Sequence, residues 1–281
     1  MIHKNLYIID IMHLAHRCYH VHKDLFTSTG KPVGMIYGAK NFLEGFIDQF
    51  HPDYLVAARE CEGETWRHIL YPSYKGNRKE KEEDFLAQLP NFFKLFEEVG
   101  IPVYQFDGYE ADDVIGSIAN KYGKEDTKCF IVSADKDFMQ LVSKNVNIVK
   151  PLKNKTYEII GTNEVVQKTG LLVSQIVDYL GLVGDTADNL PGVKGVGPKT
   201  AEKLLKSHAD IEGVYNCLFL QKKPIQEKLI KSQKDCFMTR ALARIVTDLD
   251  VNIDFESAEI LREDLSKDNV INFYKSLEFQ V

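Results

Sequence analysis

The sequence predicts an α/β fold, with a mostly parallel β-sheet flanked by helices and a largely helical C-terminal region. Two observations lead to this prediction. In the N-terminal two-thirds, short apolar runs rich in β-branched and aromatic residues alternate with amphipathic stretches, which is typical of a parallel sheet with crossover helices. After Gly181 the pattern changes to a glycine-rich turn that leads into residues with helical spacing.

Five strands and three long helices are expected in the first part of the chain. The expected strands cover residues 6–10, 54–58, 102–106, 129–133 and 146–149, and the expected helices cover 35–50, 85–99 and 110–122. Residues 72–84 have no apolar periodicity and are expected to form a solvated loop or an exposed helix. Beyond the glycine-rich turn the chain is expected to be helical up to a short apolar stretch at 244–253.

The composition is that of an ordinary globular protein. Its 281 residues, 44% of them hydrophobic, suffice for one large domain or for a domain with a smaller attached module. The apolar run near the start, LYIID, is too short for a signal sequence or a membrane span, so we expect a cytoplasmic protein with no membrane partner. The five cysteines include no Cys-x-x-Cys pair, so neither a zinc site nor a disulfide framework is indicated.

The net charge of −6 argues at first against a nucleic-acid partner, because lysine and arginine drive phosphate binding. The distribution of charge matters more than its sum. If nine carboxylates gather at one metal site, the rest of the chain carries a charge of +3. An acidic chain is therefore compatible with a basic track for DNA.

Four acidic groupings stand at predicted strand ends or helix starts. They are Asp10; Glu110, Asp112 and Asp113; Asp135 and Asp137; and Asp185 and Asp188. Carboxylates three residues apart share a helix face, and those two residues apart share one side of a strand. Glu60 and Asp107 also follow predicted strands, and ligands of parallel sheets gather at the carboxyl ends of strands. The carboxylates are therefore expected to face one cleft.

Hard oxygen ligands in this number suit Mg²⁺ or Mn²⁺, and no histidine or cysteine cluster favours a softer metal. Massed carboxylates repel one another unless cations lie between them. Two ions about 3.5–4 Å apart can stabilise the attacking and leaving oxygens of a phosphodiester. The alternative is that each aspartate is a helix cap or a solvated strand end, which is the commoner role of such a residue taken singly.

The order of the motifs favours the first interpretation. The segments YIIDIMHLAHR, WRHILYPSYKGNR, GYEADDVIG, IVSADKDFMQLV and GLVGDTADNLPGVKGVGPKTAEKLL resemble the 5′ nuclease family, which includes flap endonucleases, 5′-3′ exonucleases and the N-terminal domain of DNA polymerase I. The resemblance covers about residues 6–205, and ALARIVTDLDV is similar to the closing helix and strand of the family. It implies a PIN-like nuclease domain at 1–180 with a helical arch at about 72–100, and a helix-hairpin-helix DNA-binding region with closing helices at 181–281.

The resemblance also implies roles for the carboxylates. Asp10, Glu110 and Asp112 would hold the first of two Mg²⁺ or Mn²⁺ ions, and Asp135, Asp137, Asp185 and Asp188 the second, with Asp113 between them or in an outer shell. Two positions depart from the family pattern. Glu60 stands where the family has an aspartate, so it is expected to reach a metal through water. Ile11 replaces a glycine and is expected to narrow the site.

Several basic and aromatic residues take their expected roles from the same resemblance. Lys75 and Arg78 would stabilise the charge of the scissile phosphate at the base of the arch. Arg17 would contact a phosphate, and Tyr74 would stack on an unpaired base. Arg67 and Lys79 are expected to contact DNA. Without the flanking carboxylates, the run from Arg78 onward would be interpreted as a solvated charged helix.

Residues 190–205 fit a helix-hairpin-helix pattern. Glycines let the backbone approach a phosphate, and the start of a helix attracts it, so this segment is expected to grip duplex DNA without reading its sequence. The expected DNA contacts are Gly195, Val196, Gly197, Lys199 and Thr200, and the resemblance adds a K⁺ ion held by the hairpin carbonyls. The alternative is a plain glycine-capped helix joint.

The function predicted from these features is that of a structure-specific 5′ nuclease acting on DNA with a flap, a fork or a free 5′ end. We expect a monomer that works with a DNA polymerase in trans. Two other functions stay open: an RNase acting on RNA/DNA hybrids, and a catalytically weak protein that binds DNA structures. His13, His16, His20 and His22 are expected to be core or surface residues rather than ligands, and Trp66 is expected to pack in the core.

Overall fold

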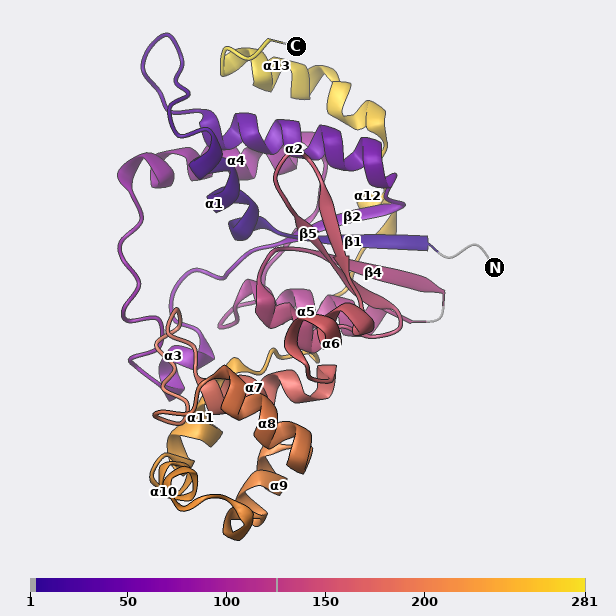
Figure 1. The fold of residues 1–281 in the computed structure, drawn as a ribbon. Coiled ribbons are helices and arrows are strands. Elements are labelled where there is room, and N and C mark those ends of the chain that lie inside the picture. Colours follow the sequence, from indigo (N-terminus) through magenta and orange to yellow (C-terminus); the bar gives the residue numbers. More distant parts are fainter. Residues whose placement is uncertain (1–3, 125, 281) are drawn as a thin grey trace.

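A computed structural model describes residues 4–124 and 126–280 (Figure 1). Its centre is a six-stranded sheet in the order β3-β2-β1-β4-β5-β6, in which all neighbours are parallel except β5 and β6. The strands are β1 Lys4–Asp10, β2 Tyr54–Ala58, β3 Val103–Tyr104, β4 Thr127–Val132, β5 Val146–Pro151 and β6 Tyr157–Ile160. The predicted α/β class with a mostly parallel sheet is confirmed.

The five predicted strands exist, although β3 is shorter than expected and β4 begins earlier. The strand β6 was not predicted, because YEII is short and offers little alternation. β6 is an antiparallel edge strand that returns from β5 through a tight turn. The apolar stretch 244–253 forms no helix or strand, so the closing strand implied by the resemblance of ALARIVTDLDV does not form, and Val251 and Ile253 anchor the stretch to the core.

Helices cover both faces of the sheet. They are α1 Ile11–Val21, α2 Gly34–Phe50, α3 Trp66–Leu70, α4 Glu83–Val99, α5 Ala111–Tyr122, α6 Thr162–Thr169, α7 Ile176–Val183, α8 Pro198–His208, α9 Ile211–Asn216, α10 Lys223–Lys231, α11 Gln233–Ala243, α12 Phe255–Ala258 and α13 Asp268–Ser276. Alternate residues of β1 point to opposite faces, so Tyr7 and Ile9 join the core under α1, α2, α4 and α13, whereas Leu6 and Ile8 join the core that contains α5.

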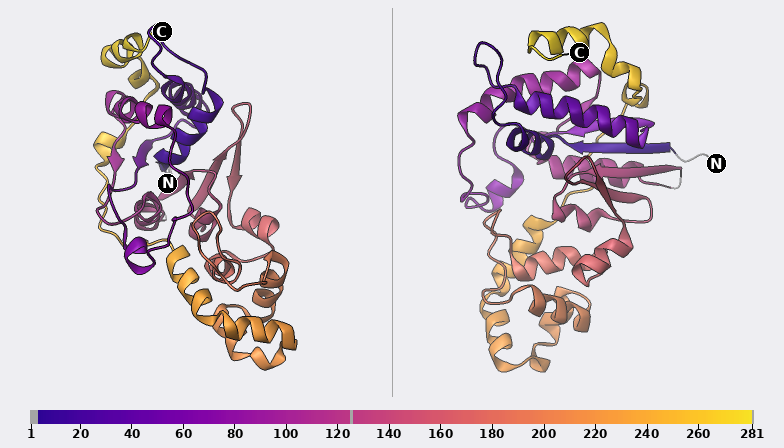
Figure 2. Two further views of the ribbon diagram at one scale, coloured as in Figure 1. Left: turned by 90° about the vertical axis from the view of Figure 1, so that its left-hand side faces the viewer. Right: turned by 45° about the horizontal axis from the view of Figure 1, so that its top comes forward.

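Helices α7 to α11 form the C-terminal module, which extends below the sheet (Figures 1 and 2). The chain then runs back past the sheet, and α13 packs against α4 at the opposite end of the molecule. The last helix therefore covers the N-terminal sheet instead of extending the module. No described helix is long and apolar enough to cross a membrane.

The expected arch at about 72–100 consists of two parts. Residues 72–77 are turns and residues 78–82 are extended, and together they make a strap that climbs along one side of the molecule (Figure 1). α4 follows and is packed in the core through Phe92 and Phe96, which are fully buried. In this structure the helical part of the segment belongs to the core, and the strap is the exposed part.

A buried ion pair joins α3, α5 and the segment after α11. The guanidinium of Arg67 donates to both carboxylate oxygens of Asp113, at 2.6 and 2.8 Å, and also to the carbonyls of Leu242 and Arg244. Asp113 further accepts from the backbone N–H of Val246 at 2.9 Å. Because Asp113 is 0% exposed and Arg67 only 2%, each charge depends on the other for its solvation.

We predict that Asp113→Ala lowers the free energy of unfolding by about 3–5 kcal/mol, because it removes the bidentate partner of the buried Arg67 guanidinium and leaves only Glu110, at 3.3 Å, as a counter-charge. Chemical denaturation measures this change. Asp107→Ala is the matched control, since Asp107 is an exposed carboxylate just before α5 and its loss should cost less than about 0.5 kcal/mol. An Asp113→Ala protein as stable as the wild type would contradict the structural role given to this pair.

Candidate active site

A cavity of about 260 Å³ lies at the carboxyl ends of β1 and β4. The structure brings seven of the nine expected ligands to its wall: Asp10, Glu60, Asp112, Asp135, Asp137, Asp185 and Asp188. They come from the end of β1, the loop after β2, the start of α5, the turn after β4 and the loop after α7. The carboxyl ends of the parallel strands meet at one edge of the sheet, and the loop after α7 returns to that edge. Carboxylates that are distant in the sequence therefore lie together.

Local capping fixes the direction of several of these side chains. Asp10 caps α1: its Oδ1 accepts from the backbone N–H of His13 at 3.0 Å, and its Oδ2 accepts from the hydroxyl of Ser133 at 3.0 Å. Asp135 and Asp185 accept from backbone N–H groups two residues ahead, each at 2.8 Å. Each carboxylate thus uses its chain neighbours to hold its orientation at the cavity.

Three basic side chains balance the negative charge. Lys75 Nζ lies 2.6 Å from Glu110 Oε1, Arg78 Nη2 lies 2.6 Å from Asp188 Oδ1, and Lys136 Nζ lies 3.1 Å from Asp185 Oδ2. Glu110 stands at the N-cap of α5, behind the cavity wall, and reaches the site through Lys75. Burial disfavours the charged form of Lys75, but Glu110 and Asp188 outweigh it and raise its pKa.

Three of the carboxylates, Asp10, Asp112 and Asp137, have raised pKa values. Burial, and then the charge of Asp135, raises the pKa of Asp137 to about 8. Burial also raises the pKa of Asp10, and burial together with Asp10, Asp135 and Glu110 raises the pKa of Asp112 well above its usual value. Such shifts mean that ionising all of these groups is unfavourable unless more positive charge enters the cavity.

The donor set fits a hard divalent cation. All the acidic ligands offer oxygen, and Asp137 Oδ1 is buried with no hydrogen-bond partner, which leaves it available to a cation. Among residues 4–124 and 126–280, no three His, Cys, Asp or Glu side chains converge closely enough to hold one ion in the arrangement seen. Lys75, Arg78 and Lys136 engage three of the carboxylates, so a cation would have to draw those carboxylates away from them.

The base of the strap is docked on the loop that carries Asp185 and Asp188. The backbone N–H of Lys75 donates to the carbonyl of Asp188 at 3.0 Å. The Asn77 amide donates to the carbonyl of Thr186 at 2.6 Å, and the Asn189 amide donates to that of Ser73 at 2.7 Å. These contacts place Lys75 and Arg78 beside the carboxylates from the other end of the chain.

Two residues expected at the site are held elsewhere. Asp113 was expected to bind or flank a metal, but its oxygens are taken by Arg67, Trp66 and Val246. Arg67 was expected to contact DNA, but it is only 2% exposed and fully engaged in that ion pair. Both expectations conflict with the structure, because the i, i+3 spacing of Glu110 and Asp113 does not tell which face of the helix is buried. Trp66 packs in a small apolar cluster, as predicted.

Tyr74 and Arg17 also depart from their expected roles. The ring of Tyr74 is 4% exposed, so it cannot stack on an unpaired base. Its hydroxyl instead lies 3.1 Å from Glu110 Oε2 and 3.0 Å from Asp188 Oδ2, between the two carboxylates. Arg17 donates to the carbonyls of Pro151 and Leu152 and lies outside the carboxylate cavity.

Of the two residues that depart from the family pattern, Glu60 lies at the site and Ile11 does not. Glu60 lines the cavity, its side chain is 44% exposed, and its Oε1 lies 4.0 Å from Lys75 Nζ. Ile11 was expected to narrow the site, but it is fully buried in the core and does not line the cavity. The side chain of the residue after Asp10 points away from the carboxylates.

Seven residues that were not predicted at the site also line the wall: Met12, His13, His16, Lys81, Ala111, Lys136 and Ala187. Lys136 stands between Asp135 and Asp137, and its place in SADKD was a signal that it would share their cleft. His13 and His16 also line the cavity, although they were expected to be core or surface residues. Their spacing from Asp10 places them on one side of α1. His13 Nε2 accepts from the backbone N–H of Ala134 at 3.2 Å.

The expected hairpin lies at the start of α8. Gly195 has φ of +81°, and no atom lies within 4 Å of the position that a Cβ of Gly197 would take, so the backbone is open there. Lys199 is exposed and Thr200 half-buried, whereas Val196 is buried, so Val196 offers only its backbone. Lys228 Nζ donates to the Gly195 carbonyl at 2.9 Å, so K⁺ at this oxygen would have to displace that ammonium group.

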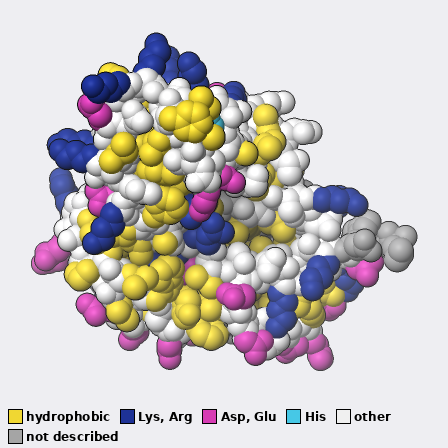
Figure 3. Space-filling view, turned by 90° about the horizontal axis from the view of Figure 1, so that it is seen from below, with side chains coloured by type: hydrophobic (Ala, Val, Ile, Leu, Met, Phe, Trp, Pro, Cys, Tyr) yellow, Lys and Arg dark blue, Asp and Glu magenta, His cyan; other side chains and the backbone are white. Residues whose placement is uncertain are grey.

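The module around this hairpin is basic although the chain is acidic. Residues 190–244 contain eleven Lys and Arg against five Asp and Glu. Seen from below, many acidic side chains lie along the lower edge of the view, whereas Lys and Arg side chains project at the top, the left and the right (Figure 3). The module itself therefore offers positive charge to a polyanionic ligand, although the whole molecule is acidic.

Comparison with known families gives matches along most of the chain. Residues 5–170 match the 5′-3′ exonuclease N-terminal resolvase-like domain, and residues 171–266 match the 5′-3′ exonuclease C-terminal SAM fold. A 5′-3′ exonuclease of Aquifex aeolicus is 36% identical over 94% of this chain and 89% of its own length. DNA polymerase I of Caldicellulosiruptor bescii is 36% identical over 98% of this chain, which spans only 32% of that polymerase.

Solved structures share the fold. The 5′-exonuclease of T5 with zinc ions bound superposes with a TM-score of 0.74 at 20% identity, covering 98% of both chains. A bacteriophage T5 flap endonuclease in complex with DNA and metal ions gives a TM-score of 0.70 at 19% identity, again over 98% of both chains. Together with the two family matches and the Aquifex relative, the arrangement of sheet, carboxylate cavity and helical module shows that this chain belongs to the 5′-3′ exonuclease family of nucleases.

Proposed function

We propose that the chain is a structure-specific 5′ nuclease, a flap endonuclease and 5′-3′ exonuclease, which hydrolyses DNA phosphodiester bonds near a free 5′ end. The observation that carries the proposal is the cavity in which seven carboxylates from five segments meet Lys75 and Arg78. Family membership and the basic C-terminal module agree with a DNA substrate. The carboxylates of the GDTADN loop are among the seven, which argues against a merely DNA-binding protein.

Asp10, Asp112, Asp135, Asp137, Asp185 and Asp188 would hold two Mg²⁺ or Mn²⁺ ions, with Glu60 and Glu110 in support. When bound, two such ions activate water and stabilise charge on the attacking and leaving oxygens of a phosphodiester. The chain itself supplies the orientation: backbone N–H groups and Ser133 fix the carboxylates. Tyr74 acts as a positioning residue, because its hydroxyl lies between Glu110 and Asp188 and sets their separation.

Lys75 and Arg78 would contact the scissile phosphate. In the structure Lys75 pairs with Glu110 and Arg78 pairs with Asp188, and both basic side chains line the cavity. With these carboxylates engaged by metal, Lys75 and Arg78 would donate to phosphate oxygens, where charge develops in the transition state. Their attachment to the Asp185–Asp188 loop keeps them in reach of the same phosphate.

The C-terminal module would hold the duplex. Gly195, the backbone of Val196, Gly197, Lys199 and Thr200 present an open helix start to the DNA backbone, which gives a grip independent of sequence. A K⁺ ion at the Gly195 carbonyl would replace Lys228. The 5′ strand would pass the strap, where Lys79 is exposed, and the terminal nucleotides would unpair at a cost of a few kcal/mol, which is lowest at forked ends. A monomer acting beside a DNA polymerase in trans fits this scheme.

The metal assignment predicts the behaviour of Asp112→Ala. With a 5′-labelled DNA flap and Mg²⁺ or Mn²⁺, the wild type should cut near the junction, and EDTA or Asp112→Ala should abolish cutting. Asp107→Ala, which removes an exposed carboxylate outside the cavity, should cut normally. Robust cutting by Asp112→Ala would refute the assignment, and preference for a matched RNA flap or the RNA of a hybrid would favour the RNase alternative.

If Lys75 stabilises the transition state, its loss should lower kcat more than it weakens DNA binding. Lys75→Met should lower kcat about 10²–10³-fold, since it removes a charged donor aimed at the transition state. Lys79→Met is the matched control, because Lys79 is exposed outside the cavity and should change KM and its salt dependence instead. Single-turnover cleavage and DNA binding without divalent metal separate the two effects. Equal changes of kcat and of KM in Lys75→Met and Lys79→Met would contradict the separate roles given to these lysines.

The raised pKa values predict how pH affects stability. Because folding raises the pKa of Asp137 to about 8, and raises those of Asp10 and Asp112, the metal-free fold gains stability at low pH and loses it as pH rises toward 8. Mg²⁺ competes with these protons, so the rise in Tm on adding Mg²⁺ should be larger at pH 8.5 than at pH 6. Thermal scans at both pH values test this, and Asp137→Asn should reduce the difference. An equal gain in Tm at both pH values would contradict the charge balance described here.

A further inference from the structure

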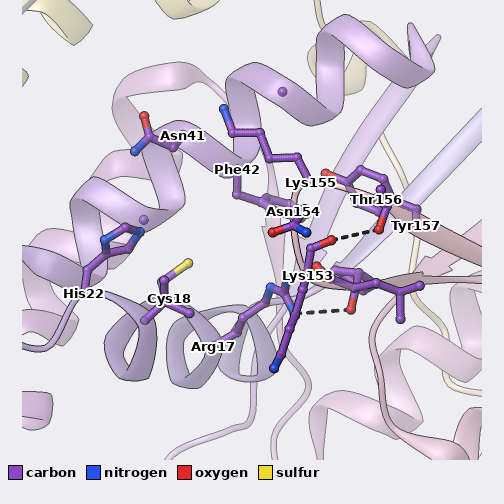
Figure 4. A pocket seen from close by; sticks show the side chains of 15 residues that line it. Arg17, Cys18, His22, Asn41, Phe42, Lys153, Asn154, Lys155, Thr156 and Tyr157 are labelled. Atoms are coloured by element: carbon purple, nitrogen blue, oxygen red, sulfur yellow. Dashed lines mark hydrogen bonds between the residues drawn. The ribbon is translucent and has the colours of Figure 1, made fainter.

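A second cavity, of about 530 Å³, lies between α1, α2 and the β5-β6 hairpin (Figure 4). Its wall includes Arg17 and Cys18 of α1, Phe42 of α2, and Lys155 and Tyr157 of the hairpin. Neighbouring residues of α1, His13 and His16, line the carboxylate cavity. The two cavities are therefore separated by one helix, and none of the roles discussed above uses the second one.

The wall of this cavity is basic. It includes Arg17, Lys153 and Lys155 and no Asp or Glu. Within the described parts of the chain, none of these three side chains forms a salt bridge, whereas many other cations on the molecule do. Arg17 uses its guanidinium to hold the carbonyls of Pro151 and Leu152 at the base of the hairpin (Figure 4). In a chain of net charge −6, an uncompensated basic pocket selects for an anion.

Two residues at the pocket depart from local preference. Gly45 lies inside α2, where glycine is less favourable than alanine. Packing does not require it, since a Cβ there would meet only Lys155 Cδ, at 3.9 Å, whereas a Cβ at Gly38 would clash with Cys18 Cβ at 2.8 Å. Lys155 has φ of +55° beside Asn154 at +56°, in a turn position that favours glycine. The strained turn places a lysine at the pocket, and Gly45 leaves room beneath it.

We propose that this pocket binds a nucleotide unit, with Lys153 and Lys155 on the phosphate and the base against the half-buried rings of Phe42 and Tyr157. Apolar and aromatic walls with a few cations suit a ligand that joins a flat ring to an anionic group. Asn41, Asn154 and Thr156 supply polar groups for the edge of a base. The choice of a nucleotide rests on the proposed function, since nucleotides are the chemistry of its substrate and product. The source is either a released deoxynucleoside monophosphate or an unpaired stretch of the DNA strand.

Calorimetric titration of the full chain with dTMP in EDTA tests the proposal. Wild type should bind dTMP, and Lys155→Gly should weaken binding about tenfold or more, because a charge-assisted contact is lost. This variant suits its own turn better than lysine does, so its Tm should stay equal or rise. Gly45→Met, which places a side chain in the pocket, should also abolish binding. Lys144→Ala, which removes an exposed lysine outside the pocket wall, is the matched control.

Further titrations distinguish the two sources. If the ligand is part of a strand, Lys155→Gly should weaken binding of a short oligothymidylate by the same factor as dTMP. If it is a free mononucleotide, the oligothymidylate should be unaffected, and either result supports the pocket. Equal dTMP affinity in wild type, Lys155→Gly and Gly45→Met, no binding at all, or inorganic phosphate binding as tightly as dTMP would overturn the proposal. Flap cleavage by the wild type with Mg²⁺ tests the proposed function separately, because these titrations contain no metal.

Discussion

Concentrated negative charge at the carboxyl end of the sheet is the constraint on which the rest of the structure depends. Asp10, Asp112 and Asp137 all have raised pKa values, because burial and mutual repulsion oppose ionisation. In the arrangement seen, Lys75, Arg78 and Lys136 offset part of this charge. The proposed metal ligands include partners of the same three ion pairs, so basic side chains lie where a phosphate would arrive once these carboxylates are engaged by metal. The unfavourable ionisation of the carboxylates would thus favour cation binding at this site.

That arrangement needs a rigid frame, because the carboxylates come from five separate segments. At the centre of the sheet β1 forms this frame, because the strand is paired with β2 and β4 and its final residue, Asp10, caps α1. The Arg67–Asp113 pair supplies it at the edge, because it fixes the start of α5 against α3 and the end of α11. Asp112 and Asp113 are neighbours in the chain, yet one faces the cavity and the other locks the helix that carries it.

Contact between the strap and the Asp185–Asp188 loop connects the two halves of the chain. Lys75, Asn77 and Asn189 form hydrogen bonds across more than a hundred residues of sequence, so the basic side chains are held beside part of the acidic set. If the C-terminal module binds a duplex, the strap contacts would hold Lys75 and Arg78 at a fixed place relative to the scissile phosphate. The second pocket lies on the other side of α1 from the carboxylate cavity. Its wall contains Arg17 of α1 together with Lys153 and Lys155, and it has no Asp or Glu.

Hydrophobic periodicity and short-range spacing are local properties, so the α/β class, the five parallel strands and the acidic motifs could be predicted from the amino-acid sequence. The family could be predicted as well, since the motifs lie in the family's order. Which carboxylate faces the cavity depends on long-range packing: spacing could not distinguish Asp112 from Asp113, because Arg67 and Val246 contact Asp113 on one side of α5. In the same way, burial of Tyr74 between Glu110 and Asp188 rules out the expected stacking on a base, and Arg17 donates to carbonyls at the base of the β5-β6 hairpin instead of lining the carboxylate cavity. These outcomes depend on partners distant in the chain, and no local pattern contains them.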